Sequence, residues 1–407
     1  MSIDDRLDAT QTIPSANTFA GELTPSAKSV SDGFRRVFGG EPLVFRAPGR
    51  VNLIGEHTDY NDGFVVPAAL QFATWAAIGP RPDASVHAYS ENFGEGRVSP
   101  LAGIAAAPTG HWSDYVRGVA AVLQRGGQSL RGANLYIAGD VPLGSGLSSS
   151  ASLEVACAYA FLALANVQLD RREIARACQT AEHEYAGMKC GIMDQFIACF
   201  ARRDHALLLD CRSLQYELLP LDRDVRLVIC NSLVKHELAN SEYNQRRMQC
   251  EAGVHALRAH LHDISALRDV SLEQLERHRS ALTDTVYRRC RHVCSENERV
   301  QEAAGCLRSG NLARFGKLMG ESHRSLRDDY EVSCRELDLL VEIANGIDGV
   351  LGARMTGGGF GGSTVNLVRS SAVPEFEKIV RREYERATGR TPPIYVCSAA
   401  EGAGPAE

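Results

Sequence analysis

The chain has 407 residues, a length that favours two domains over one, and its 44% hydrophobic content is sufficient for buried cores. The formal net charge of −6 argues against nucleic acid as the main partner, and no apolar run reaches the ~18 residues that a membrane-spanning helix needs. The 12 cysteines are scattered without paired spacing, which is typical of reduced thiols in a cytoplasmic protein and not of a disulfide framework.

Residues 1–23 are polar and show little periodicity, so we expect a flexible tail there and no signal peptide. From Pro25 to Phe38 the apolar residues recur at helical spacing, and two glycines directly after Phe38 end the pattern. Apolar runs then predict strands over residues 43–45, 64–79, 85–89 and 135–139.

The string from Ala47 to Tyr60 concentrates polar and charged side chains beside glycines and a proline, and we interpret it as a loop. Carboxylates and an imidazole placed close together suit a ligand with many hydroxyl groups, because each hydroxyl offers a donor and an acceptor. A surface turn with ordinary polar residues is the alternative for each residue taken alone. For the whole string we favour a ligand site, with the candidates Arg50, Glu56, His57 and Asp59.

Glycines and serines fill the stretch from Pro142 to Ser152, between a predicted strand and a predicted helix over 153–164. Glycines let a ligand approach the main chain, and the free N–H groups of a helix N-terminus attract anions. The stretch lacks the lysine of a Walker loop, so backbone N–H groups and a metal ion would have to neutralise a bound phosphate. A simple Gly/Ser turn that caps the helix is the alternative.

Asp194 is the one acid in an apolar stretch that glycines interrupt, and a lone buried charge is costly. It is interpreted either as a helix cap or as a catalytic base. We place a domain boundary between residues 215 and 216, which gives domains 24–215 and 216–407. A mostly helical part is expected from 236 to about 346, followed by a glycine run over 356–363, a helix over 373–386 and a strand over 394–397.

Three glycine-bearing strings, in this order, resemble those of the GHMP family of small-molecule kinases. Residues 49–60 resemble the galactokinase signature within that family, 142–152 its ATP-phosphate loop, and 356–363 its third, glycine-rich motif. The resemblance implies an α+β fold of two domains, one like ribosomal protein S5 and one ferredoxin-like, with the active site between them. It also implies transfer of the ATP γ-phosphoryl group to the C1 hydroxyl of galactose, which yields galactose 1-phosphate and ADP.

The resemblance assigns roles to individual positions of this chain. Asp194 would be the base and Arg50 its charged neighbour, while Ser150 and Glu182 would hold Mg²⁺. The sugar would contact Glu56, His57, Thr58, Asp59 and Tyr243. The phosphates would lie on Gly144, Ser145, Gly146, Leu147, Ser148, Ser149 and Ser150, and the nucleotide near Ser90 and Trp112.

Two alternatives within the resemblance stay open. Some relatives are transcriptional sensors that bind sugar and ATP without turnover, and their residues after the loop serines are altered. Here Ser149–Ser152 is complete, which favours an enzyme. A kinase for N-acetylgalactosamine or another sugar is the second alternative. We expect a cytoplasmic monomer that acts on small molecules and has neither a nucleic-acid nor a membrane partner.

Overall fold

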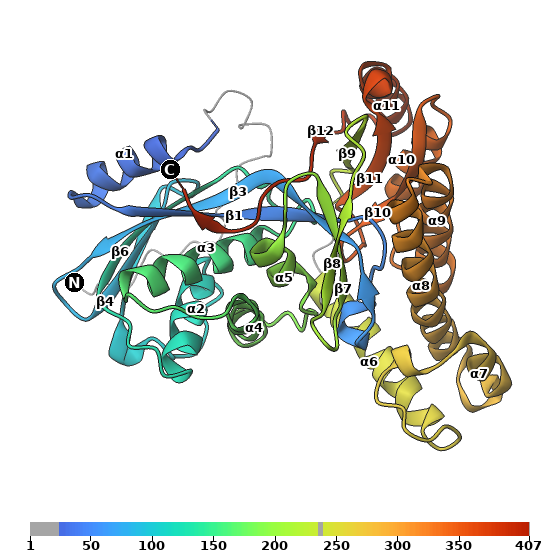
Figure 1. Ribbon diagram of the computed structural model, residues 1–407, viewed down its shortest axis with the longest axis horizontal. Coiled ribbons are helices and arrows are strands. Elements are labelled where there is room, and N and C mark those ends of the chain that lie inside the picture. Colours follow the sequence, from blue (N-terminus) through green and yellow to red (C-terminus); the bar gives the residue numbers. More distant parts are fainter. Residues whose placement is uncertain (1–23, 235–238, 407) are drawn as a thin grey trace, which may run out of the picture.

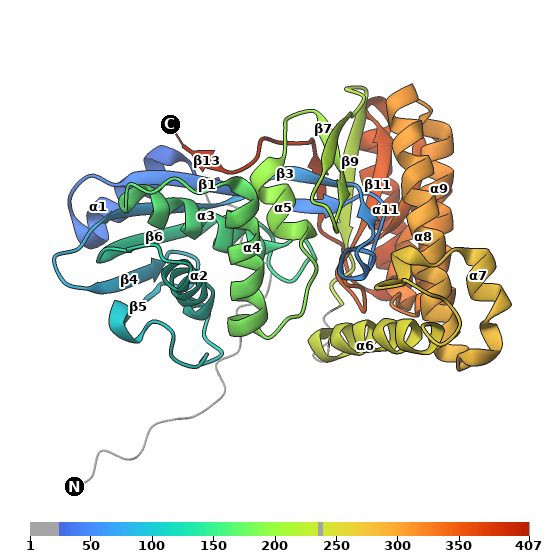
Figure 2. The same ribbon diagram turned by 60° about the horizontal axis from the view of Figure 1, so that its bottom comes forward.

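The computed structural model describes residues 24–234 and 239–406, so the tail expected at 1–23 lies outside the described residues. The elements form two groups that lie side by side along the long axis of the molecule (Figure 1). Helices α1 (Ala27–Phe38) to α5 (Met193–Phe200) accompany one sheet, and helices α6 (Ala239–Leu257) to α11 (Val373–Thr388) accompany a second (Figure 2). The α+β class expected from the sequence is confirmed.

The first group is built on a six-stranded sheet in the order β13-β1-β3-β6-β4-β5. Its strands are β1 (Leu43–Asn52), β3 (Pro67–Pro80), β4 (Ser85–Ser90), β5 (Glu95–Pro100), β6 (Ala133–Gly139) and β13 (Gly404–Pro405). Paired strands are antiparallel except β4 and β6, which run parallel. A parallel pair needs a long connection, and here it contains β5 and α2 (Ser113–Arg125).

Successive residues of a strand face opposite sides of its sheet, and this sheet buries both sides. Ala76 and Ile78 of β3 belong to a large core that α2, α3 (Ser149–Leu164), α4 (Arg171–Ala181) and α5 complete. Ala77, between them, belongs to a small core beneath α1. A Cβ atom at Gly33 of α1 would lie 2.3 Å from the Tyr136 ring, so a glycine is needed for this close approach.

The second group contains a four-stranded antiparallel sheet in the order β10-β11-β9-β12. Its strands are β9 (Val225–Asn231), β10 (Val350–Thr356), β11 (Ser363–Arg369) and β12 (Ile394–Cys397). Val228 packs with α10 (Arg335–Asn345) and α11, whereas Leu227 and Ile229 pack with α8 (Asp284–Ser309) and α9 (Leu312–Ser325). This sheet is therefore also covered on both faces, and α6, α7 (Leu272–Arg277) and part of α8 form a further core beside it.

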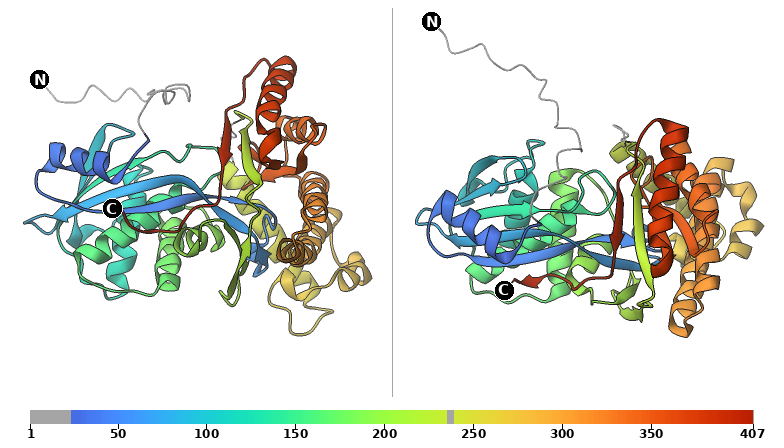
Figure 3. Two further views of the ribbon diagram at one scale, coloured as in Figure 1. Left: turned by 45° about the horizontal axis from the view of Figure 1, so that its top comes forward. Right: turned by 90° about the horizontal axis from the view of Figure 1, so that it is seen from above.

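Two connections tie the groups together. A small sheet joins β2 (Phe64–Val65), β7 (His205–Asp210) and β8 (Tyr216–Pro220), so strands on both sides of the predicted 215/216 boundary are paired. After β12 the chain returns to the first group, where β13 pairs with β1 (Figure 3). The boundary itself stays a prediction.

The predicted helix over 25–38 and the predicted strands over 135–139 and 394–397 are confirmed. The loop predicted from Ala47 is wrong in its first part, because β1 continues to Asn52. Ala47 and Val51 are fully buried, and the register shifts between Pro48 and Arg50, where proline lacks the N–H that a regular ladder needs. Among the described residues, no helix combines the length and apolar character required to cross a membrane.

Candidate active site

An ion pair between β1 and α5 lies at the centre of the predicted site. The Arg50 guanidinium donates from Nε to Asp194 Oδ1 at 2.8 Å and from Nη2 to Oδ2 at 2.7 Å. The two side chains are 7% and 20% exposed, so the pair is largely shielded from water. A two-pronged contact of this kind fixes the orientation of both groups. Ile192 caps α5, so Asp194 is not the helix cap that was the simpler interpretation.

The serine-rich loop rests directly on this pair. Arg50 Nη1 donates to the Gly146 carbonyl at 2.6 Å, and the Ser148 hydroxyl donates to Asp194 Oδ2. Gly144, Gly146 and Ser148 all have positive φ angles, of 67°, 76° and 60°. The helix α3 begins at Ser149, so its unpaired N–H groups lie beside the Arg50–Asp194 pair. This arrangement suits an anion such as a phosphate.

The glycine run after β10 packs between the other two strings. Ser363 donates to the Ser145 carbonyl at 2.7 Å, which joins the run to the serine-rich loop. At Gly357, where φ is +84°, a Cβ atom would lie 3.2 Å from the Gly146 carbonyl oxygen. Gly357 N–H donates to Glu56 Oε1 at 2.8 Å, which joins the run to the 56–59 string. The glycines of this run therefore allow its backbone to lie directly against the serine-rich loop.

Glu182 and Ser150 lie together, as the metal assignment requires. Glu182 begins a π-helical turn (Glu182–Ala186) after α4, and Ser150 donates to its Oε1 at 2.8 Å. Gln195, a residue that the sequence analysis missed, donates to Glu182 Oε2 at 2.5 Å. Burial raises the pKa of Glu182 to about 7, and the nearby Asp194 charge adds to the rise. A hydroxyl and a buried carboxyl group that forms no ion pair in the described part of the chain are donors that fit Mg²⁺.

The residues of the 56–59 string have different surroundings. Glu56 is buried and accepts from Gly357 and from Thr356, the latter at 3.1 Å. The Thr58 hydroxyl is directed at the Gly55 and Phe64 carbonyls, so this side chain holds its own loop, and its role as a sugar contact stays a prediction.

Asp59 lies against the loop that leads to Asp194. A Cβ atom at Gly191 would be 2.1 Å from Asp59 Cγ, so only glycine fits there. Burial raises the pKa of Asp59 to about 7, and the charges of Asp194 and Glu56 raise it further. Tyr243 completes this side, with its ring centroid 5.4 Å from that of His57. The structure therefore brings the sugar candidates and the candidate base together.

Ser90 and Trp112 lie farther along the first sheet. Ser90, at the end of β4, pairs in register with Ile137 of β6, the strand that leads into the serine-rich loop. Trp112 donates from Nε1 to Glu95 at 2.9 Å and stacks on Phe93, whose side chain is exposed. These positions are compatible with the nucleotide-side role predicted for both residues, and that role stays a prediction.

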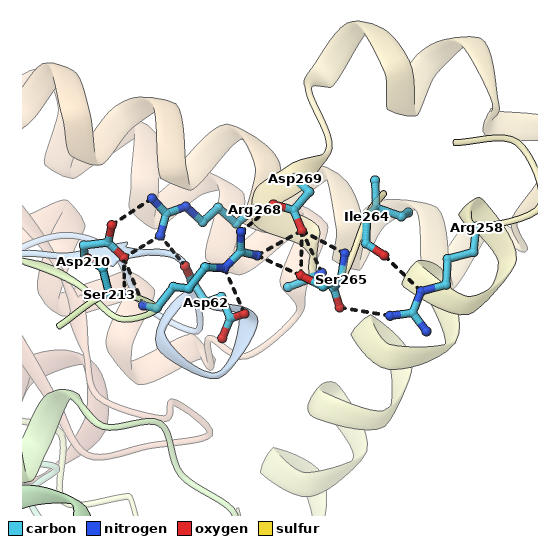
Figure 4. Close-up of polar contacts among 10 residues, drawn as sticks. Asp62, Asp210, Ser213, Arg258, Ile264, Ser265, Arg268 and Asp269 are labelled. Carbon is cyan, nitrogen blue, oxygen red and sulfur yellow. Dashed lines mark hydrogen bonds and ion pairs between the residues drawn. The ribbon is translucent and has the colours of Figure 1, made fainter. Parts of the chain in front are cut away.

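Two arginines fasten Asp62, directly after the 56–59 string, to the second group, and Figure 4 labels one of them, Arg268. Arg212 donates to Asp269 at 2.7 and 2.9 Å and to Asp62 at 3.1 Å. Arg268 donates to both carboxylate oxygens of Asp210 and to the Asp62 carbonyl. We name these five residues the arginine clamp. The clamp joins three segments that are far apart in sequence.

Comparisons with known proteins agree with this geometry. The model of the galactokinase galactose-binding signature matches residues 32–80, and the models of the GHMP kinase N-terminal and C-terminal domains match 114–202 and 303–386. A galactokinase of Roseiflexus sp. (strain RS-1) is 48% identical over 372 residues, covering 91% of this chain and 95% of the relative. A galactokinase of Chloroflexus aggregans is 50% identical over 370 residues, with the same two coverages.

This chain belongs to the galactokinase family. A solved structure of Lactococcus lactis galactokinase complexed with galactose superposes with a TM-score of 0.90 at 38% identity, over 93% of this chain and 99% of that one. A mevalonate kinase structure at 20% identity, with a TM-score of 0.62, shares the fold alone. The two-domain GHMP kinase fold that the sequence predicts is thereby confirmed, as is membership of the galactokinase branch.

Proposed function

We propose that the candidate site, where the three motifs meet, transfers the γ-phosphoryl group of ATP to the C1 hydroxyl of galactose, with Asp194 as the general base. The observation that carries this proposal is the pairing of Asp194 with Arg50 directly beneath the serine-rich loop. In phosphoryl transfer, a protein mainly positions the reactants and stabilises the charge that develops. It also supplies one group that takes the proton of the nucleophile.

Asp194 has the lone pairs that this role requires. Its carboxylate accepts two hydrogen bonds from Arg50 and one from Ser148, and a carboxylate offers about four acceptor positions. The remaining position takes the proton of the C1 hydroxyl as the oxygen attacks the γ-phosphorus. The bond from that phosphorus to the β–γ bridging oxygen breaks, and ADP leaves. Arg50 holds the base and adds positive charge near the transferring group.

The two sides of the candidate site match the two substrates. The buried Glu56 and His57 and the partly buried Asp59 offer polar groups to sugar hydroxyls, and the Tyr243 ring packs beside that of His57. The N-terminus of α3 and the glycines before it suit the phosphates. Ser150 and Glu182 would hold Mg²⁺, which when bound neutralises phosphate charge that no lysine of this loop neutralises.

An assay of ATP consumption with a panel of sugars tests this proposal. Galactose is expected to support turnover, and glucose and N-acetylgalactosamine are expected to support far less. If N-acetylgalactosamine supports faster turnover than galactose, then N-acetylgalactosamine is the substrate and the galactose assignment is wrong. Absence of sugar-dependent turnover in a folded protein that still binds ATP and galactose would favour a sensor over an enzyme.

A further inference from the structure

A chain of hydrogen bonds leads from His57 into the core of the second group. His57 Nδ1 is 2.7 Å from the Tyr60 hydroxyl, which is 2.7 Å from the Tyr330 hydroxyl. Tyr330 in turn is 3.1 Å from Cys250 Sγ on α6. Tyr330 is fully buried and Cys250 is 1% exposed, so the far end of the chain is closed to water.

Each member of this chain is neutral at physiological pH. Burial holds the pKa of His57 well below its usual value and the pKa of Tyr60 and Tyr330 well above theirs. Burial also raises the pKa of Cys250 to about 11. Each hydroxyl and the thiol therefore has one proton to donate, and His57 has one proton on one of its two nitrogens.

The chemistry of the groups favours one direction of donation. A neutral imidazole nitrogen accepts well from a phenol, whereas a thiol is both a weak donor and a weak acceptor, so the imidazole end of the chain sets the direction. If Tyr60 donates to His57 Nδ1, then Tyr330 donates to Tyr60 and Cys250 donates to Tyr330. The reverse direction would end the chain on the sulfur. The tautomer of a histidine is set by the hydrogen bond that its other nitrogen makes.

We propose that Tyr60, Tyr330 and Cys250 form a positioning relay that places the His57 proton on Nε2, so that His57 donates a hydrogen bond to a galactose hydroxyl oxygen. His57 Nε2 is buried and makes no hydrogen bond of standard distance and angle among the residues that the structure describes, and the Gly358 backbone beside the ring favours a proton on it. A buried donor without a partner is costly, and a ligand acceptor removes that cost. The sugar role of His57 rests on the proposed function, whereas the tautomer does not.

Two hydrogen bonds hold the backbone on both sides of the His57 side chain. His292 Nε2 donates to the Glu56 carbonyl at 3.1 Å, and Asn61 donates to the His57 carbonyl at 2.9 Å. His57 itself has a φ of 63°, a left-handed conformation that this support holds in place. These hydrogen bonds fix the position of the imidazole, and the relay places its proton on Nε2. His57 Nε2–H is then a hydrogen-bond donor with one fixed direction on the sugar side of the site.

Histidine-labelled protein allows the tautomer to be measured without any substrate. Long-range ¹H–¹⁵N correlation separates the two neutral tautomers, and a His57→Gln spectrum assigns the signal. The Nε2–H pattern is expected for the intact chain and for Cys250→Ser, because serine keeps the relay. The Nδ1–H pattern, a tautomer average or a charged ring in the intact chain would overturn the relay.

Kinetics then test what the relay does for the sugar. Tyr60→Phe should raise the KM for galactose about five- to tenfold, the worth of one hydrogen bond, with the KM for ATP unchanged. Tyr384→Phe is the matched control, because it removes another buried hydroxyl bond, to the Ser232 carbonyl, far along α11.

The two failures give different results. An unchanged galactose KM in folded Tyr60→Phe, or an equal rise in Tyr384→Phe, would overturn the positioning role. A second result separates the two proposals. If the Nε2–H pattern is found but galactose is not phosphorylated and does not shift the His57 signal, the proposed function is wrong, whereas the tautomer assignment holds.

Discussion

The candidate site and the arginine clamp both gather carboxylates, yet their charges are balanced differently. In the candidate site, burial raises the pKa of Asp59 and Glu182 to about 7. In the clamp, hydrogen bonds from Arg212 lower the pKa of Asp269. Burial opposes the shift at Asp210, but hydrogen bonds from Arg268 and Ser213 bring its pKa down to about 2.

The clamp and the candidate site therefore have different roles. The clamp supplies two arginines for its aspartates, so it is complete in the protein alone and contributes to stability. The candidate site pairs Arg50 with Asp194, and within residues 24–234 and 239–406 neither Asp59 nor Glu182 forms an ion pair with an arginine, lysine or histidine. Burying the charged form of these two carboxyl groups costs free energy until a ligand binds them. Acids with strongly shifted pKa values are typical of functional sites.

The largest effect is expected at Asp194. Asp194→Asn should fold and bind both substrates, because asparagine keeps the size and part of the hydrogen bonding. Its kcat should fall by about 10²–10⁴, the usual worth of a general base. Steady-state kinetics with a thermal-unfolding control checks this. A purified Asp194→Asn protein with near-normal kcat would show that the proton goes elsewhere.

A smaller effect is expected at Asp59, on the sugar alone. Asp59→Ala should raise the KM for galactose by about 10- to 100-fold, because a site that loses the hydrogen-bond partner of a sugar hydroxyl leaves that hydroxyl unpaired. The KM for ATP should change little. Steady-state kinetics of the variant gives the KM for galactose and the KM for ATP. Equal changes in these two constants would argue against a contact between Asp59 and the sugar.

A change at Glu182 tests the predicted Mg²⁺ site. Glu182→Ala should shift the Mg²⁺ dependence of turnover to higher concentration by about tenfold, since the ion binds through few protein ligands. Glu184→Ala is the matched control, because Glu184 lies in the same turn but pairs with Arg125 on the surface. Identical Mg²⁺ titrations for all three proteins would contradict the assignment.

The smallest effect is expected in the clamp, on stability. A lowered pKa stabilises the folded state above the unfolded value of about 3.9, and this stabilisation is lost as the pH falls toward the folded value. Asp269→Asn should therefore lower Tm at pH 7 by about 2–4 °C and by less near pH 3. Asp348→Asn, at an exposed site, should leave Tm unchanged at both values. A Tm loss for Asp269→Asn that is equal at pH 7 and pH 3 would remove the electrostatic explanation.

The sequence predicts local chemistry well and long-range contacts poorly. Asp194 stands out because it is a lone acid in an apolar stretch, and the GHMP motifs indicate its partner Arg50, 144 residues away. The Tyr60–Tyr330 contact joins residues 270 positions apart, and buried tyrosines give no signal beyond that of core residues. The course of β1 past Ala47 was missed for a local reason, since glycine and proline beside charges are typical of loops.

A double-mutant cycle on Arg50 and Asp194 tests most directly the claim that these residues act as one unit at the meeting point of the three motifs. Arg50→Ala, Asp194→Asn and the double variant would be compared by kcat/KM, with galactose and ATP titrated separately. The double variant is predicted to be about as impaired as the more impaired single variant, because residues that act as a unit are not additive. Losses that multiply would show that the two side chains contribute independently, and would contradict the account.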